Sequence, residues 1–229
     1  MGMTTHTDRQ YEEELQDLRR RILEMGGLVE KQIANAVRAL ITRDRALAEE
    51  TISKDHAVNR YDVDIDELCI RLLALRQPAA RDLRFITTAL KITVDLERIG
   101  DRAASISERA IELADEPELK PYIDVPRMAE VSSGMLRRSL DAFVREDGDL
   151  ALDVCRSDDE VDKLNGQIFR ELLSFMIENP QTITRAMRIL FVSKYLERIA
   201  DHATNIAEMV IFMVKGKSIR HVAELPPSV

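Results

Sequence analysis

The sequence LERIGD at residues 96–101 recurs one hundred residues later as LERIAD at residues 196–201. The repeat indicates an internal duplication. Each copy places a Glu and an Asp four residues apart, and on a helix such residues stand side by side on one face. Because neighbouring like charges repel by a few tenths of a kcal/mol unless a cation lies between them, the repeated carboxylate pair indicates a cationic ligand.

The rest of the chain has the pattern of long helices. Apolar residues recur at spacings of three and four without any long alternation of period two. The 8 glycines and 7 prolines of the 229 residues punctuate the chain only sparsely. This pattern predicts six helices, at about residues 8–42, 45–77, 79–115, 125–146, 149–178 and 181–215.

The duplication extends beyond the hexapeptide, because residues 39–59 match residues 142–162. Each copy then consists of three helices, and a helix of about 35 residues spans roughly 50 Å. Rods of this length pack as elongated bundles. The sequence therefore predicts an all-α fold of two tandem three-helix bundles, at residues 1–116 and 124–216, followed by a C-terminal tail at residues 217–229.

Composition excludes several function classes. The formal net charge of −8 opposes the phosphate backbone, so we expect no nucleic-acid partner. The longest apolar run, Met209 to Val214, is far shorter than the roughly 20 residues of a membrane span. The start of the chain lacks the pattern of a secretory signal. The 2 cysteines have no CxxC spacing. We expect a cytoplasmic protein without direct membrane insertion.

Hairpin geometry brings a second pair of polar residues to the first motif. The turn at Pro78 is so short that the helices on its two sides must run antiparallel. Counting out from this turn, Asn59 and Glu97 lie at one height, and Asp55 and Asp101 lie at the next. The apolar stripe of each helix faces another way, so these four side chains are predicted to lie together on the outer surface.

The second copy repeats this arrangement around the turn at Pro180. Asp162 and Glu197 are equidistant from the turn, and so are Asp158 and Asp201. The two copies keep this match although the spacing between their helices differs.

Four oxygen-bearing side chains at one level suit a hard or borderline cation. The alternative interpretation is a solvated charged face. Iron, zinc, manganese, magnesium and calcium all remain open, and the sequence does not choose among them. His56 and His202 adjoin the clusters, but each side chain points about 100° away from its acidic neighbour, and whether they are ligands is left open.

The sequence contains no sign of catalytic machinery. It lacks the Glu-x-x-His spacing of di-iron bundles, a glycine-rich phosphate loop and Cys/His zinc spacing. It also shows no nucleophile beside a base. No catalytic or other cofactor-binding residue is predicted.

Three arginines crowd the first hairpin turn: Arg76, Arg81 and Arg84. They suit a phosphate group or an acidic partner. The alternative is ordinary surface pairing with neighbours such as Asp82, at less than about 1 kcal/mol for each pair.

With these residues in hand, the chain resembles the PhoU family of phosphate-uptake regulators over nearly its whole length. The resemblance is carried by the segments RQP at 76–78, DLR at 82–84, DLERIGD at 95–101 and YLERIADHATNI at 195–206. It implies surface E(D)xxxD motifs that bind multinuclear metal clusters, with iron or zinc as the first candidates. These motifs map to Asp55 with Asn59, Glu97 with Asp101, Asp158 with Asp162, and Glu197 with Asp201. Asn59 departs from the carboxylate pattern, which predicts a first cluster one charge poorer and weaker in metal occupancy.

The resemblance also implies a function. It describes a regulator, not an enzyme, that contacts the ATPase of a phosphate ABC transporter and a sensor histidine kinase. It would limit uptake and keep the phosphate-starvation response off when phosphate is plentiful, and it is expected to be a homodimer. Two alternatives stay open: a carboxylate-bridged metalloenzyme, either hydrolase or oxidase, and a metal buffer or scaffold.

Overall fold

The computed structural model describes residues 3–217, and every regular element within them is a helix. This confirms the all-α prediction. The predicted tail lies outside the described residues from residue 218 onwards. The helices are α1 Met3–Thr42, α2 Arg45–Ser53, α3 Asp55–Arg76, α4 Ala80–Ala114, α5 Asp124–Arg145, α6 Gly148–Glu178, the 3-10 turn η1 Pro180–Thr182, and α7 Ile183–Lys215.

The predicted helix at 45–77 is wrong in one respect, because α2 ends at Ser53 and α3 begins at Asp55. The hydroxyl of Ser53 donates to the carbonyl of Glu50 at 2.8 Å. The ring of His56 contacts the carbonyl of Ser53 through Nδ1. Such local bonds between side chains and backbone compete with the helical pattern, and they account for the break between the two helices. The other predicted helix ends agree within two residues, except that α1 starts five residues earlier than expected.

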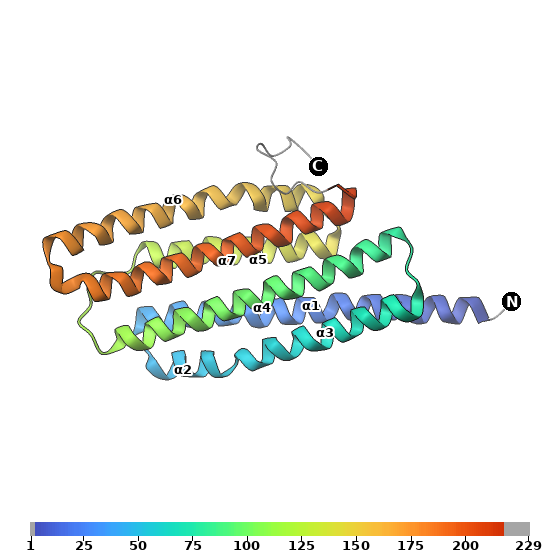
Figure 1. Ribbon diagram of the computed structural model, residues 1–229, viewed down its shortest axis with the longest axis horizontal. Helices are drawn as coiled ribbons and strands as arrows, with labels where there is room; N and C mark the ends of the chain where they lie inside the picture. The colour runs from blue at the N-terminus through green and yellow to red at the C-terminus, as the bar shows by residue number, and fades with distance from the viewer. Residues whose placement is uncertain (1–2, 218–229) are drawn as a thin grey trace.

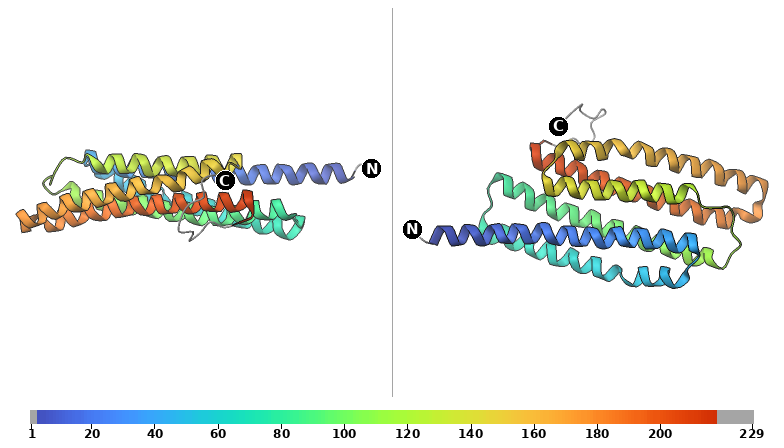
Figure 2. Two further views of the ribbon diagram at one scale, coloured as in Figure 1. Left: turned by 90° about the horizontal axis from the view of Figure 1, so that it is seen from above. Right: turned by 180° about the vertical axis from the view of Figure 1, so that it is seen from behind.

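The long helices form two layers. Figure 1 looks onto the first layer, in which the helices lie side by side in the order α3, α4, α7 and α6. The view from behind in Figure 2 shows α1 and α5 covering the other side of this layer. Since the two hairpins α3–α4 and α6–α7 both belong to the first layer, the grooves that carry the predicted clusters are on one side of the molecule.

The two repeats share one hydrophobic core. The buried apolar residues form a single cluster that includes members of both repeats. Phe85 of α4 stacks on Phe143 of α5, with ring centroids 5.2 Å apart and planes 10° from parallel. Such an aromatic pair adds roughly 0.5–1.5 kcal/mol beyond area burial. The repeats therefore stabilise each other.

In the antiparallel contact of α4 with α7, equivalent pairs of positions from the two repeats meet. Asp95, only 7% exposed, accepts a hydrogen bond from His202 Nδ1 at 2.8 Å. The positions one hundred residues away from these two are Tyr195 and Arg102, and there the guanidinium lies 6.0 Å from the ring centroid. The seam thus uses equivalent positions twice, once as a hydrogen bond and once as a cation–π contact.

Two adjacent glycines in α1 should respond oppositely to alanine. A Cβ on Gly26 would lie 2.3 Å from Cδ1 of the buried Leu140, whereas a Cβ on Gly27 would meet no atom within 4 Å. We expect Gly27→Ala to stabilise the protein by about 0.5–1 kcal/mol through helix propensity. We expect Gly26→Ala to destabilise it by about 1–2 kcal/mol because the core is overpacked. Urea unfolding measures both, and effects of the same sign would contradict the close approach of α1 to α5.

Candidate metal centres

The first candidate centre is the groove between α3 and α4. Asp55 is the first residue of α3, where the helix dipole favours a negative charge. Asn59 Nδ2 donates to Asp55 Oδ2 at 3.3 Å. Gln32 of α1 reaches the other carboxylate oxygen through Nε2 at 3.5 Å. Asp55 is therefore oriented from two helices.

Electrostatic effects place Asp55, Glu97 and Asp101 in one group. Burial and then the negative charge of Asp101 raise the pKa of Asp55. Burial and then the charges of Asp101, Asp62 and Asp55 raise the pKa of Glu97. Negative charges that shift one another's pKa in this way lie close together. The hairpin register expected from the sequence therefore agrees with the electrostatics of this groove.

Asp62 is a member of this cluster that sequence reasoning missed. It lies two turns beyond Asp55 on α3, on the same face of the helix. At the offset of 103 residues, Asn59 corresponds to Asp162, and Asp62 corresponds to Asn165. The two copies have exchanged Asp and Asn between neighbouring positions. With Asp62 near Glu97 the first groove has four carboxylates, and the weaker metal occupancy expected there stays a prediction.

The second candidate centre is the groove between α6 and α7. Burial and then the negative charges of Asp201 and Asp162 raise the pKa of Asp158 to about 6. The hydroxyl of Thr204 acts in the opposite direction and lowers this pKa. Burial and then the charges of Glu197 and Asp201 raise the pKa of Asp162. All four residues predicted for this centre thus belong to one electrostatic cluster.

Two cations form ion pairs with the carboxylates of the second groove, whereas in the first groove the charge of Arg98 lowers the pKa of Glu97. Lys194 forms an ion pair with Glu197, and Arg198 Nη1 donates to Asp201 Oδ2 at 3.1 Å. The residue equivalent to Lys194 in the first repeat is Val94. A metal ion in the second groove has to compete with a lysine that the first groove lacks.

The donor chemistry of the grooves fits a hard or borderline cation. Carboxylate and amide oxygens are the preferred ligands of such ions. Oε1 of Gln32 is buried without a hydrogen-bond partner. It lies, like Asp55 Oδ1, 3.2 Å from where a Cβ on Gly100 would be, so glycine at this position leaves these oxygens room.

Among residues 3–217, no three Asp, Glu, His or Cys side chains are already arranged to hold one ion. Like charges without a cation repel, and in the second groove lysine and arginine occupy two of the carboxylates. Metal binding would require these side chains to turn toward a common point. The metal assignment therefore stays a prediction that rests on the donor set and on the clustering of charge.

The two histidines near the clusters are engaged elsewhere. His56 contacts the carbonyl of Ser53 at the break between α2 and α3. His202 donates to Asp95 in the seam between the repeats.

The raised pKa values predict an unusual pH dependence for the metal-free protein. The pKa of Asp158 is about 6 in the folded state and 3.8 without perturbation, and the pKa values of Asp55, Asp62 and Glu97 are raised as well. At these four groups the folded state binds protons more tightly than the unfolded state, so their contribution to stability increases as the pH falls through 6 toward 4.

We expect the free energy of unfolding in EDTA to be greater at pH 5 than at pH 7.5 by about 1 kcal/mol, after allowance for solvent screening of these partly exposed groups. Thermal unfolding at constant ionic strength measures this difference. A lower melting temperature at pH 5 would contradict the clustering of the carboxylates.

Taken together, the fold and the grooves define a class of protein: an internally duplicated helical body with one acidic groove in each repeat. A family model described as "PhoU domain" matches the chain twice, at residues 22–110 and 125–210. The chain belongs to the PhoU family. None of the helices between residues 3 and 217 has the length and apolar content needed to cross a bilayer.

Relatives match the chain over nearly its whole length. The phosphate-specific transport system accessory protein PhoU homolog of Pseudomonas aeruginosa is 45% identical over 222 residues, which cover 96% of this chain and 92% of the relative. The accessory protein PhoU of Escherichia coli K12 is 36% identical, over 97% of this chain and 92% of its own. These relatives are named as accessory proteins rather than enzymes.

Solved structures have the same fold. A crystal structure of PhoU from Pseudomonas aeruginosa superposes with a TM-score of 0.87 at 46% identity, covering 90% of this chain and all of that one. The phosphate transport system regulatory protein PhoU from Streptococcus pneumoniae superposes with a TM-score of 0.86 at 30% identity, covering 91% of this chain and 99% of that one.

Proposed function

We propose that this protein is a metal-binding cytoplasmic regulator of phosphate uptake and of the phosphate-starvation response. The observation that carries the proposal is the match, over nearly the whole chain, to relatives named as phosphate-specific transport system accessory proteins. The protein would act by contact with the ATPase of a phosphate ABC transporter and with a sensor histidine kinase. No observation on this chain specifically favours the metalloenzyme or the metal store.

The acidic grooves are the proposed control element of this regulator. A bound multinuclear cluster, of iron or zinc in the first instance, would supply positive charge that neutralises the carboxylates. The carboxylates and Gln32 would hold the ions, and Lys194 and Arg198 would be released from Glu197 and Asp201. Metal loading would thus change the charge of the first helix layer, which is the face that we propose meets the transporter and the kinase.

A test of the function uses cells that lack the chromosomal gene and carry a reporter of phosphate-starvation transcription. The wild-type chain is expected to restore repression in high phosphate and to permit expression in low phosphate. Expression that does not change when the chain is supplied would contradict the proposed role.

A separate apolar patch is the proposed homodimer contact. Six large side chains on the outer half of the α6–α7 hairpin are 36–73% exposed. Their exposed area is on the order of 500 Å², within the roughly 300–600 Å² of the largest apolar patch on a typical monomer, which is often functional. Homodimer interfaces are more apolar than transient ones, so this patch suits a second copy of the chain. Its members are Phe169, Leu173, Ile177, Ile183, Met187 and Phe191.

The first repeat keeps only part of this patch, with Ile70 in place of Leu173 and Leu83 in place of Ile183. Phe169 corresponds to Asp66, and Phe191 corresponds to Lys91. We expect the double variant Phe169→Ser, Phe191→Ser to sediment as a monomer at concentrations at which the wild-type chain is a dimer. The control variant Ile70→Ser changes an exposed apolar residue of the first hairpin and should remain dimeric. A dimer that survives the double substitution would place the contact elsewhere.

A further inference from the structure

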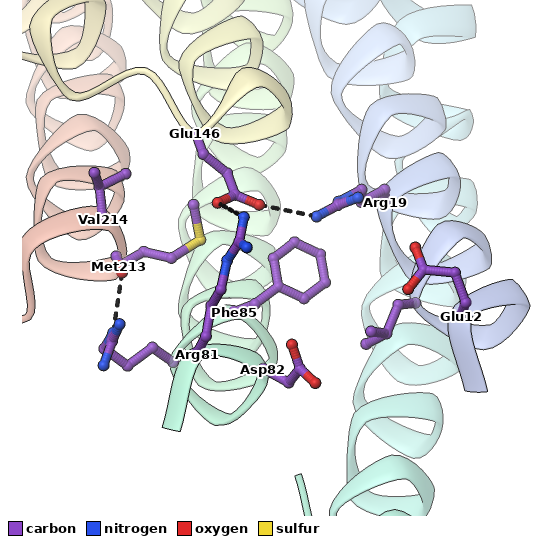
Figure 3. A pocket seen from close by; sticks show the side chains of 10 residues that line it. Glu12, Arg19, Arg81, Asp82, Phe85, Glu146, Met213 and Val214 are labelled. Carbon is purple, nitrogen blue, oxygen red and sulfur yellow. Dashed lines mark hydrogen bonds and ion pairs between the residues drawn. The ribbon is translucent and has the colours of Figure 1, made fainter. Parts of the chain in front are cut away.

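A polar cavity of about 480 Å³ lies at the end of the molecule where the first hairpin approaches the second repeat. Figure 3 shows side chains from several elements converging there. The carboxylate of Glu146, just after α5, lies between two guanidinium groups. Arg19 Nη2 donates to one oxygen at 3.1 Å, and Arg81 Nη2 donates to the other at 2.6 Å.

The two arginines have further capacity to bind an anion. Arg19 lies over the ring of Phe85, 4.7 Å from its centroid, and its Nε is buried without a hydrogen-bond partner. The guanidinium of Arg19 is thus held in place by packing with one donor unused. The side chain of Arg81 is 76% exposed, so it can adjust to a ligand that enters from solvent.

Glu146 is poorly suited to be a permanent partner. Its side chain is 27% exposed and is attached to the short connection between α5 and α6. It can therefore swing out without disturbing either helix.

Within residues 3–217, the positions equivalent to those of the arginine cavity are occupied differently in the other repeat. At the offset of one hundred residues, Arg81 and Arg84 correspond to Gln181 and Thr184. At the offset of 103, Glu146 corresponds to Arg43, which caps the end of α4 by donating to the carbonyl of Ala114 at 2.7 Å. The arginine pair is therefore a feature of this end of the molecule that the internal repeat alone does not explain.

We propose that this cavity binds a small tetrahedral oxyanion of the phosphate class between Arg19 and Arg81, in place of the Glu146 carboxylate. Guanidinium groups match such anions with parallel hydrogen bonds, and the charge assistance makes these bonds strong. The third arginine of the cavity, Arg84, is anchored by its Nε to the carbonyl of Met213 at 3.0 Å. The inference does not depend on the proposed regulatory function.

Two other carboxylates limit the affinity. Glu12 and Asp82 also line the cavity, and Figure 3 shows them apart from the Glu146 carboxylate. Asp82 accepts a hydrogen bond from the hydroxyl of Tyr11 at 3.1 Å, which fixes its direction. With Glu146 in place the cavity carries equal numbers of acidic and basic side chains, so we expect dissociation constants in the millimolar range.

The test is calorimetric titration of the full chain with inorganic phosphate at constant ionic strength. We expect saturable binding by the wild-type chain. Glu146→Gln removes the competing charge and should tighten binding about tenfold, because the two charge-assisted pairs of Glu146 with Arg19 and Arg81 no longer have to be broken. Arg81→Gln should weaken binding at least tenfold, and Arg81→Lys should retain part of it. Arg81 is exposed, so its variants are expected to fold, and circular dichroism checks this.

A matched control is the ion pair of Arg137 with Glu30, which joins α5 to α1 at 2.9 Å outside this cavity. Arg137→Gln should bind phosphate as the wild-type chain does. The proposal is overturned if the wild-type chain shows no saturable binding. It is also overturned if Glu146→Gln binds phosphate no more tightly, or if Arg81→Gln and Arg137→Gln have equal effects.

Discussion

Replacing Glu197 with Gln and Asp201 with Asn should empty the α6–α7 groove of metal and leave phosphate-starvation genes expressed in high phosphate. The double variant removes two of the four carboxylates of the second centre, and a cation site that loses half its charged ligands loses most of its affinity. The metal content of each chain, measured by elemental analysis after purification without chelator, should fall to that of the first groove alone. The reporter assay measures the loss of repression.

The control for this variant removes two exposed acidic groups from α6, the other helix of the same hairpin. Asp153 and Glu160 lie on α6, and their side chains are 61% and 51% exposed. The variant Asp153→Asn, Glu160→Gln loses as much charge but should keep both the metal and the repression. If the Glu197 and Asp201 variant keeps its full metal content, the assignment of the second centre is wrong. If it loses metal but still represses, the grooves do not control the regulator.

Phe143→Ala should lower the free energy of unfolding by about 3–5 kcal/mol, the largest effect expected for a single substitution. Phe143 is completely buried and stacks on Phe85 of the other repeat, so the cavity forms at the junction of the two bundles. Because the core is shared, the variant should still unfold in one transition at lower denaturant concentration.

Ile123→Ala is the control, since this residue just before α5 is 75% exposed and lies outside the proposed dimer patch. Its effect should be below about 1 kcal/mol. Two separate transitions in urea, or equal effects of the two substitutions, would contradict a core shared by the repeats.

The sequence predicted correctly those features of the fold that depend on the spacing of residues along the chain. The repeat and the short turns at Pro78 and Pro180 predicted the two antiparallel hairpins, because helix period and turn length fix which residues share a level. The exchange of Asp and Asn between the copies was also visible in the sequence. Asp62 lies seven residues after Asp55, so the spacing of four that defines the motif does not include it.

The contacts between the repeats could not be predicted in the same way. Asp95 with His202, and Arg102 with Tyr195, meet only because α4 and α7 cross antiparallel. Nothing in the spacing along either helix specifies that crossing. The same holds for the Glu146 cavity, whose lining comes from both repeats. The break between α2 and α3 escaped prediction because it depends on local hydrogen bonds of Ser53 and His56 rather than on glycine or proline.

The most direct test of the metal assignment is anomalous diffraction from crystals of the chain purified without chelator, recorded on both sides of the iron and zinc absorption edges. The account predicts anomalous peaks in both grooves, with ions of one cluster roughly 3.5–4 Å apart where carboxylates bridge them. Metal-loaded crystals with both grooves free of anomalous density, or with their ions bound elsewhere, would contradict it. The expected ligands are Asp55, Asn59, Asp62, Glu97 and Asp101 in the first groove, and Asp158, Asp162, Glu197 and Asp201 in the second.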